Sequence, residues 1–398
     1  MSEFAKLNIL IVPCTEWLEG SQQRLHHFAE EWSRNHNVHV LYVERPSNFG
    51  CREKRDLRSL NMTIHKIHTI RTHDLSLFYI LNSMLQFFSI LQIILTSCIN
   101  VIVIEGLGTS SFAVLAARIL NKTVVYDYSD YYPGFISFYG DSGLRIRLIE
   151  ALGRLSDFLN LKFSSATVAV SDGLVQRCSS YSKRVFKVSN GVSSEIFGSA
   201  KPRNYGDTKE NTILGFVGTI DSWVSLETVI DAIHNLNFNL HTKTSLLVIG
   251  NGPRMTSVIE YANKCKVIDK VKFVGWIPYV HLPEHFERMD ICVLPFDRSK
   301  ISTLSMPIKI HEYAICKKPV ISAPLPEIKK TYGNSVLYAS TAQEYAENVG
   351  KLISDKSLSL SLAENAYRIA EKHSWNALAN AYEQVLMVFA THWVPTEC

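Results

Sequence analysis

The sequence has no Cys-x-x-Cys pair, although it contains eight cysteines. Zinc sites and the disulfide frameworks of small secreted domains repeat cysteines at short spacings, so neither is predicted. Several of the cysteines lie inside apolar segments, which is typical of reduced thiols in the core of a cytosolic protein. They are Cys14, Cys51, Cys98, Cys178, Cys265, Cys292, Cys316 and Cys398.

No signal-peptide leader is expected, and the sequence has little excess charge. Residues 1–7 run directly into an expected strand and contain no apolar stretch of the kind found in signal peptides. The net charge is only +4, with basic and acidic residues intermixed, which argues against a nucleic-acid partner. The one local basic run, Arg52–Arg58, also contains Glu53 and Asp56 and is typical of a solvated loop.

One long stretch without formal charge, Leu75–Ile104, has the length of a membrane span. Amide side chains interrupt it at Asn82, Gln86, Gln92 and Asn100. Three interpretations remain open: a transmembrane helix, a helix docked on a bilayer, and an internal helix followed by a buried strand over Val101–Ile104. The interruptions favour the internal helix.

The chain of 398 residues is long enough for two domains. An apolar strand over Asn8–Pro13 is followed by a helix that opens at Gly20–Arg24 and by a second strand over Val38–Val43. After a polar, turn-rich linker over Ala200–Asn211, strands and helices alternate again from Ile213–Val217 onward. This pattern predicts two parallel sheets covered by helices, with ligands beyond the carboxyl ends of the strands.

The stretch Ser305–Ser322 is the clearest functional signal. Pro307 suits the first turn of a helix, and Lys309 and Glu312 then lie within one turn of each other. A helix N-terminus beside a lysine favours a phosphate or diphosphate, and a carboxylate one turn later suits a sugar diol. An ordinary amphipathic helix with an i,i+3 ion pair would explain the same spacing.

Seven short segments follow one another in a characteristic order. They are Gly20–Arg24, Val188–Val192, Phe216–Thr219, Val248–Pro253, Phe273–Trp276, Asp290–Pro295 and the helix of Ser305–Ser322. Together they resemble the GT-B glycosyltransferases, in particular the family 4 type that uses nucleotide-activated sugars. The resemblance extends from the Gly20 loop to the helix that begins at Trp375.

The resemblance implies an α/β fold in which two Rossmann-like domains with parallel sheets face each other across a cleft. Residues 1–200 would form the acceptor-binding domain and residues 201–372 the nucleotide-sugar-binding domain. Residues 373–398 would form a helix that packs back toward the N-terminal domain.

For the donor, the resemblance implies that Glu312 binds the nucleotide ribose. The start of the same helix would meet the diphosphate, the loop after residue 275 would hold the base, and glycine-containing turns would let the backbone approach the phosphates. The residues concerned are Ser305, Met306, Pro307 and Ile308 at the helix start, Trp276, Ile277 and Pro278 in the loop, and Gly20, Gly218, Thr219, Gly250 and Gly252 in the turns.

The sequence departs from the family pattern at two places. The first glutamate of the family's pair is Leu304 here, and the family's Arg and Lys are absent from Gly218–Ser225. Lys309 is predicted to supply the lost positive charge. This arrangement resembles a subgroup of teichuronic-acid and exopolysaccharide glycosyltransferases, which the segment Tyr126–Asp130 also fits.

Sugar transfer requires that the departing nucleoside diphosphate be neutralised, and we expect the helix start at Ser305 and Lys309 to do this. No Asp-x-Asp metal motif occurs in a suitable loop, so neither a metal nor another cofactor is predicted. An inverting reaction needs a general base, for which Asp130 and Asp127 are candidates. In a retaining reaction the leaving phosphate would guide the acceptor proton. The alternative role for Asp130 is to cap the following turn.

The expected acceptor contacts are Ser21, Gln23, Arg24 and Tyr131, although an arginine in a first helical turn is often only solvated. The expected donor is a UDP- or GDP-linked sugar, and the expected acceptor is a glycan or a lipid-linked hydroxyl at the inner membrane face. The helix Leu75–Leu95 and the run Arg52–Arg58 would dock the first domain on that membrane. The alternatives are a non-catalytic nucleotide-sugar or carbohydrate-binding module, a nucleotide-sugar epimerase and a phosphorylase.

Overall fold

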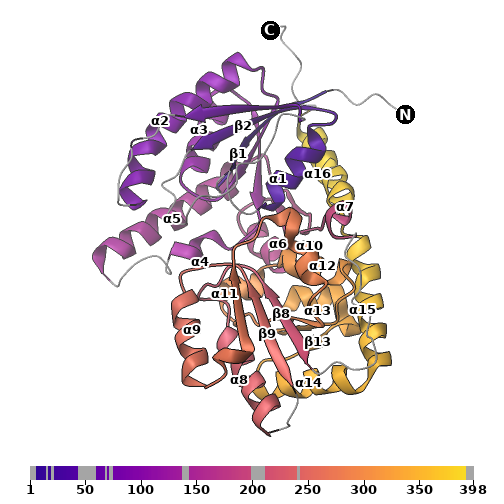
Figure 1. Cartoon of the computed structure of the whole chain (residues 1–398). Helices are drawn as coiled ribbons and strands as arrows, with labels where there is room; N and C mark the ends of the chain where they lie inside the picture. Colours follow the sequence, from indigo (N-terminus) through magenta and orange to yellow (C-terminus); the bar gives the residue numbers. More distant parts are fainter. Residues whose placement is uncertain are drawn as a thin grey trace. The chain divides into compact units, whose positions relative to one another are not determined.

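The structure, a computed structural model, describes residues 6–14, 17–18, 22–43, 60–67, 70, 75–136, 143–198, 211–239 and 243–390. The chain divides into two compact units, one of Met1–Ser189 with Trp375–Cys398 and one of Asn190–Ser374. Each unit contains a parallel sheet with helices on both faces, so the predicted α/β class with two Rossmann-like sheets is confirmed (Figure 1). The predicted linker, Ala200–Asn211, lies outside the described residues except for Asn211.

The N-terminal unit has a seven-stranded sheet in the order β3-β2-β1-β4-β5-β6-β7. The central strands β1 and β4 are almost continuously apolar and buried, as expected for a parallel sheet covered on both faces. The edge strand β3 mixes Thr, His and Lys with apolar residues, and the sequence analysis did not predict it. The strands are β1 (Asn8–Val12), β2 (Asn37–Val43), β3 (Met62–Ile67), β4 (Val101–Glu105), β5 (Thr123–Tyr128), β6 (Ala166–Ala169) and β7 (Val185–Lys187).

Helices α2, α3 and α5 cover one face of this sheet, and α1 and α16 cover the other (Figure 1). The last helix thus lies beside the first. The Trp32 indole N–H donates to the carbonyl of Ala379 at 3.3 Å, and its ring meets Tyr382 edge to face. The helices are α1 (Arg24–Trp32), α2 (Leu75–Thr96), α3 (Thr109–Ile119), α4 (Tyr132–Ile136), α5 (Leu144–Phe163), α6 (Asp172–Ser179) and α16 (Trp375–Ala390).

Helix α2 corresponds to the first part of the long uncharged stretch, and β4 to its end, as the internal-helix interpretation predicts. The buried Asn82 accepts a hydrogen bond from the backbone N–H of Ile70 at 2.7 Å and donates one to its carbonyl at 3.0 Å. Of the helices in the described part of the chain, none combines the length and the apolar character needed to cross a bilayer.

The C-terminal unit has a six-stranded sheet in the order β10-β9-β8-β11-β12-β13, so the strand order reverses between β8 and β11. Ligands of open parallel sheets bind beyond the strand ends at such a point. The strands are β8 (Thr212–Val217), β9 (Thr244–Ile249), β10 (Val271–Gly275), β11 (Ile291–Leu294), β12 (Val320–Ser322) and β13 (Leu337–Tyr338).

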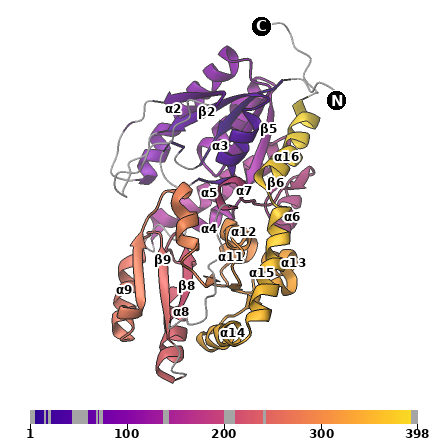
Figure 2. The ribbon, with the colours of Figure 1, turned by 45° about the vertical axis from the view of Figure 1, so that its right-hand side comes forward.

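Helices α8, α9 and α14 cover one face of this second sheet, and α10, α12, α13 and α15 cover the other (Figure 2). Residues from α8, β8, β9 and α14 form one continuous apolar core. The helices are α7 (Ser194–Phe197), α8 (Leu226–His234), α9 (Met255–Lys264), α10 (Leu282–Phe286), α11 (Lys300–Leu304), α12 (Ile308–Ile315), α13 (Pro326–Tyr332), α14 (Ala342–Ser354) and α15 (Lys356–Glu371).

The cysteines only partly follow the expectation of reduced thiols. Cys98 is disulfide-bonded, which the wide cysteine spacing did not indicate. The free thiols among the described residues are Cys14, Cys178, Cys265, Cys292 and Cys316.

Candidate functional site

The turns that follow β8 and β9 pack against each other so closely that glycine is required. Gly218 has a φ of +153° and Gly250 a φ of +131°. A Cβ at Gly250 would lie 1.9 Å from the carbonyl oxygen of Gly218, and one at Gly252 would lie 2.2 Å from that of Ile220. These two contacts are with backbone atoms, so a side chain at either position would push the turns apart.

Backbone hydrogen bonds join these turns to the loop after β10. The N–H of Gly218 donates to Ile249 at 2.8 Å, and the N–H of Gly250 donates to Gly275 at 2.7 Å. The half-buried loop of Trp276, Ile277 and Pro278 comes next in the chain, and Thr219 is exposed beside Gly218. The structure therefore brings together the predicted donor-binding residues of three separate strand ends.

Lys309, in the first turn of α12, lies over Gly218. A Cβ built on Gly218 would be 2.0 Å from Lys309 Cε and 3.1 Å from its Nζ. One turn further along the helix, the Tyr313 hydroxyl accepts a hydrogen bond from the N–H of Val217 at 2.9 Å. This bond fixes the helix face from which Lys309 projects. The structure thus places a lysine of α12 next to the turn after β8.

Glu312 lies one turn after Lys309 and is only 5% exposed. Burial raises the pKa of its carboxyl group, while the Lys309 charge and a hydrogen bond with Tyr279 act in the opposite direction. Tyr279 directly follows the Trp276–Pro278 loop. The carboxylate is therefore held next to that loop, where it can accept hydrogen bonds from hydroxyl groups.

The segment that leads into α12 is held from outside the helix. The Asn190 side-chain amide donates to the carbonyl of Met306 at 2.6 Å, and the Ser305 hydroxyl donates to Ser302 at 3.0 Å. The helix begins at Ile308, and Pro307 is its N-cap rather than part of the first turn as predicted, because its ψ of 128° is extended. The first N–H groups of α12 have no partners within the helix, which suits an anion.

In the N-terminal unit, Arg24 and Asp127 are both buried. Their side chains form an ion pair with Nε and Oδ2 3.0 Å apart, and Arg24 also donates to the carbonyl of Val188 at 3.0 Å. Burial raises the pKa of Asp127 to about 7; the Arg24 charge opposes this shift, and the Glu105 charge adds to it. The structure places Arg24 and Asp127 inside the unit rather than where an acceptor would reach them, because β5 continues through Asp127 to Tyr128.

The other predicted residues of this unit remain closer to its surface. Asp130 and Tyr131 are half-buried just after β5, and the Arg177 guanidinium lies 4.7 Å from the Tyr131 ring centroid. Gln23 caps α1, and its N–H donates to His26 Nδ1 at 2.9 Å. Gly20 and Ser21 lie outside the described residues.

The second buried carboxylate at this edge is Glu105, at the end of β4. It accepts hydrogen bonds from the N–H of Cys14 and from the Ser129 hydroxyl, both at 3.2 Å. Within the described ranges, no group of three or more His, Cys, Asp or Glu side chains is arranged to hold a metal ion.

Residues 199–369 match the family described as Glycosyl transferases group 1. We refer to residues 199–369 as the group 1 segment. The segment includes Gly218, Gly250, Trp276, Lys309 and Glu312, which were predicted to bind the donor.

One curated protein similar to this chain is TuaH of Bacillus subtilis (strain 168), which carries the name of a teichuronic acid biosynthesis glycosyltransferase. The two are 23% identical over 226 residues, which is 55% of each chain. The similarity thus spans about half the length of that relative. Its name agrees with the subgroup that the group 1 segment resembles in sequence.

Solved structures resemble the whole chain at low identity. Sucrose-phosphate synthase from Thermosynechococcus elongatus has a TM-score of 0.74 at 14% identity and covers 98% of this chain and 100% of its own. HepE from Anabaena, in complex with UDP and glucose, has a TM-score of 0.73 at 15% identity. The match covers 96% of this chain and 99% of the HepE chain. WaaG, a glycosyltransferase of lipopolysaccharide biosynthesis, has a TM-score of 0.67 at 14% identity. The match covers 95% of this chain and 99% of the WaaG chain. The predicted GT-B fold is confirmed.

Sequence reasoning missed several residues that shape the two strand edges. Asn190, Tyr279 and Tyr313 hold the group 1 segment's α12 and its carboxylate through hydrogen bonds. Glu105 and Tyr382 surround Asp127 in the other unit. The usable signals were that Tyr279 directly follows the predicted Trp276–Pro278 loop and that Asn190 lies inside the segment Val188–Val192. Nothing in the local sequence points to Tyr382, which follows Asp127 by more than half the chain.

Proposed function

We propose that the protein is a glycosyltransferase that moves a sugar from a UDP- or GDP-linked donor to a hydroxyl group of a glycan or lipid-linked acceptor. The observation that carries the proposal is Lys309 lying over Gly218 with Glu312 one turn further along α12. The HepE structures with UDP and with UDP-glucose support a nucleotide-sugar donor, and the name of TuaH supports a role in cell-surface polysaccharide synthesis.

In this proposal the diphosphate lies at the start of α12, against the glycine turns. The Lys309 ammonium and the N–H groups of the first helical turn neutralise the charge that develops on the leaving nucleoside diphosphate. No metal is needed for this step. Glu312 accepts hydrogen bonds from the ribose hydroxyls, and the Trp276–Pro278 loop contacts the base.

Of the two carboxylates predicted as general bases, Asp130 is the one we retain. It is half-buried at the end of β5, whereas Asp127 is fully buried and paired with Arg24. In an inverting reaction Asp130 takes the proton of the acceptor hydroxyl. Tyr131 and Gln23 remain the proposed acceptor contacts in the described part of this unit.

The test is release of UDP or GDP from a panel of nucleotide-sugars by the purified full-length chain, with and without lipid-linked acceptors. We expect one donor to be turned over, and Glu312→Gln to raise its KM about tenfold, because a neutral amide accepts weaker hydrogen bonds from the ribose than a carboxylate does. Glu260→Gln, an exposed substitution on α9, is the matched control and is expected to behave like the wild type.

Other outcomes would identify the alternatives. Tight nucleotide binding with no turnover of any donor would indicate a binding module. Conversion of the donor sugar to its epimer without transfer would indicate an epimerase. Unchanged donor affinity in Glu312→Gln would remove Glu312 from the site.

We also propose that the N-terminal unit docks on the cytoplasmic surface of a membrane. The stretch Leu75–Leu95 presents exposed apolar side chains at Phe88 and Leu95, while the run Arg52–Arg58 lies outside the described residues. The structure adds α5, on the same sheet face. This helix exposes the apolar side chains of Leu144, Leu148, Leu152 and Leu155. It also exposes the basic side chains of Arg147, Arg154 and Lys162. Apolar and basic groups in this combination suit an anionic lipid surface.

Liposome sedimentation tests this docking. We expect the chain to bind vesicles that contain anionic lipid several-fold more strongly than neutral vesicles, and the double substitution Leu148→Ser/Leu152→Ser to remove most of the binding. Leu360→Ser, which changes an exposed leucine of α15 in the other unit, is the control. Equal binding to both kinds of vesicle, or full binding by the double variant, would contradict the proposal.

A further inference from the structure

A pocket lies at the carboxyl edge of the C-terminal sheet, on the face covered by α8 and α14. Its volume is about 140 Å³, well above the roughly 10–15 Å³ that a single water requires by the same measure. It shares no residue with the donor site around Gly218, Lys309 and Glu312. The lining residues are Ser225, Thr228, Pro295, Phe296, Asp297, Arg298, Ala323, Pro324, Ala339, Ser340 and Tyr345.

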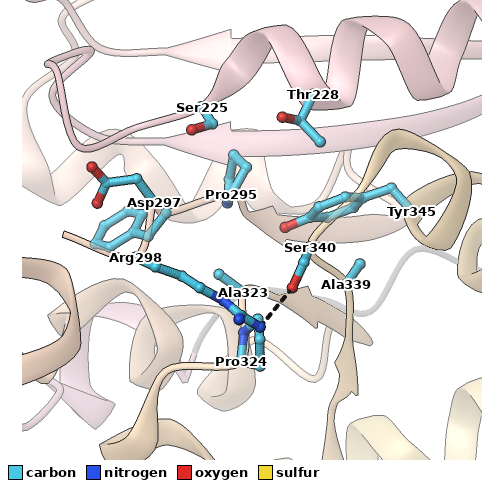
Figure 3. Close-up of a pocket in the computed structure, with 11 residues that line it drawn as sticks. Ser225, Thr228, Pro295, Asp297, Arg298, Ala323, Pro324, Ala339, Ser340 and Tyr345 are labelled. Atoms are coloured by element: carbon cyan, nitrogen blue, oxygen red, sulfur yellow. Dashed lines mark hydrogen bonds between the residues drawn. The ribbon is translucent and has the colours of Figure 1, made fainter.

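The Tyr345 side chain indicates that this pocket takes a ligand. The residue is only 2% exposed, and its hydroxyl has no hydrogen-bond partner among the residues that the structure describes. Figure 3 shows the phenol pointing from α14 into the pocket. A buried hydroxyl without a partner loses its hydration uncompensated, so a polar ligand at this position is favoured. Burial raises the pKa of Tyr345, which keeps the hydroxyl protonated and able to donate.

Most of the other polar side chains of the pocket can donate a hydrogen bond. The Arg298 guanidinium donates to the Ser340 hydroxyl at 3.2 Å (Figure 3), and that bond uses only one of its N–H groups. Ser225 is the N-cap residue of α8, yet its side chain forms no capping hydrogen bond. The N-terminus of α14 lies next to Ser340 as well, so the positive ends of two helix dipoles face the pocket.

Two acidic groups adjoin the pocket, and both already accept several hydrogen bonds. Asp297 Oδ1 accepts from the N–H and hydroxyl of Ser299 and from the Ser302 hydroxyl, at 3.1, 2.7 and 2.6 Å. Glu344 accepts from the N–H groups of Ser340 and Thr341, at 2.6 and 3.2 Å. The donors that remain available, on Arg298 and Tyr345, suit a tetrahedral anion.

We infer that this pocket binds a phosphate group, either as inorganic phosphate or on a small phosphorylated polyol. Its volume exceeds the needs of the bare anion, and Pro295, Phe296 and Pro324 offer apolar contacts to a carbon skeleton. This binding site is separate from the proposed transfer reaction and does not depend on it.

The test is titration of the full chain with inorganic phosphate at constant ionic strength. Binding is measured by calorimetry and by ³¹P line broadening. We expect millimolar affinity, a loss of about tenfold or more in Arg298→Gln, and a loss of about threefold in Tyr345→Phe. Tyr345→Phe removes only an unpartnered hydroxyl and should not destabilise the fold. Arg368→Gln, an exposed change on α15, is the matched control.

Lys309→Ala separates this pocket from the donor site, where phosphate would also find a cation. Phosphate binding that persists in Lys309→Ala and is lost in Arg298→Gln supports the inference. Tighter binding of glycerol 3-phosphate than of inorganic phosphate would indicate that the ligand is a phosphorylated polyol. The inference is overturned if phosphate and glycerol 3-phosphate both fail to bind at about 20 mM, or if Arg298→Gln binds like the wild type.

Discussion

Replacement of Lys309 by alanine is expected to lower kcat for sugar transfer by about 10²–10³-fold, the usual cost of removing one preorganised charge that stabilises a transition state. The ammonium group lies over Gly218, where it would meet the diphosphate that we propose to bind at the start of α12. Because the leaving group gains charge during the reaction, the loss should appear mainly in kcat and less in donor affinity. Steady-state kinetics with the donor found by the panel would measure both.

Two further variants sharpen this prediction. Gly218→Ala would place a methyl group 2.0 Å from Lys309 Cε, so the flexible lysine must move and part of the same defect should appear. Lys351→Ala removes an exposed lysine of α14 and should leave the kinetics unchanged. A Lys309→Ala enzyme within about threefold of wild-type kcat would show that the leaving group is stabilised by other groups.

Arg24→Met is expected to destabilise the N-terminal unit by about 3–5 kcal/mol near pH 8, because it leaves the Asp127 carboxylate buried without its partner. Hydrogen exchange in peptides from α1 and β5, together with denaturant unfolding, would locate and measure the loss. The double variant Arg24→Met/Asp127→Asn should recover most of it. Arg34→Met, which breaks an exposed pair with Glu31, should cost less than about 1 kcal/mol.

The sign of the pH dependence gives an independent check. The pKa of Asp127 is raised to about 7 in the folded chain, above its unfolded value of about 3.9. The folded state therefore holds this proton more tightly, and stability is lost as pH rises from about 4 to about 7. At about pH 5 Asp127 is protonated, so Arg24→Met should cost clearly less than at about pH 8. An equal cost at both pH values would contradict a charged pair.

The alternation of strands and helices was sufficient to predict both sheets and the position of α12, because buried parallel strands and amphipathic helices leave strong local patterns. The burial of Asp127 could not be predicted from local sequence patterns. The residue was predicted as a general base, but it lies inside β5, and its partner Arg24 lies a hundred residues earlier in the chain. Such long-range pairs leave no periodic signal in a single sequence.

The same limit explains the errors at the sheet edges. Strand β3 is only partly buried, so its sequence is not uniformly apolar and does not resemble a strand of the sheet centre. The pocket at Tyr345 collects side chains from five separate segments between Ser225 and Tyr345, none of which is distinctive alone. Lys309 was identified because the residues that drew attention to it, Pro307 and Glu312, lie within about one helical turn of it.

The return of α16 to the first helix has a consequence for synthesis of the chain. Phe28 and Trp32 of α1 pack against Trp375 and Tyr382, which leave the ribosome only after the whole C-terminal unit. The first unit therefore cannot complete its fold, and the aromatic face of α1 stays uncovered, until the second unit has been synthesised. The second unit is a contiguous stretch of chain and can fold before the first is complete. A nascent chain stalled before Trp375 would present that face to chaperones and proteases.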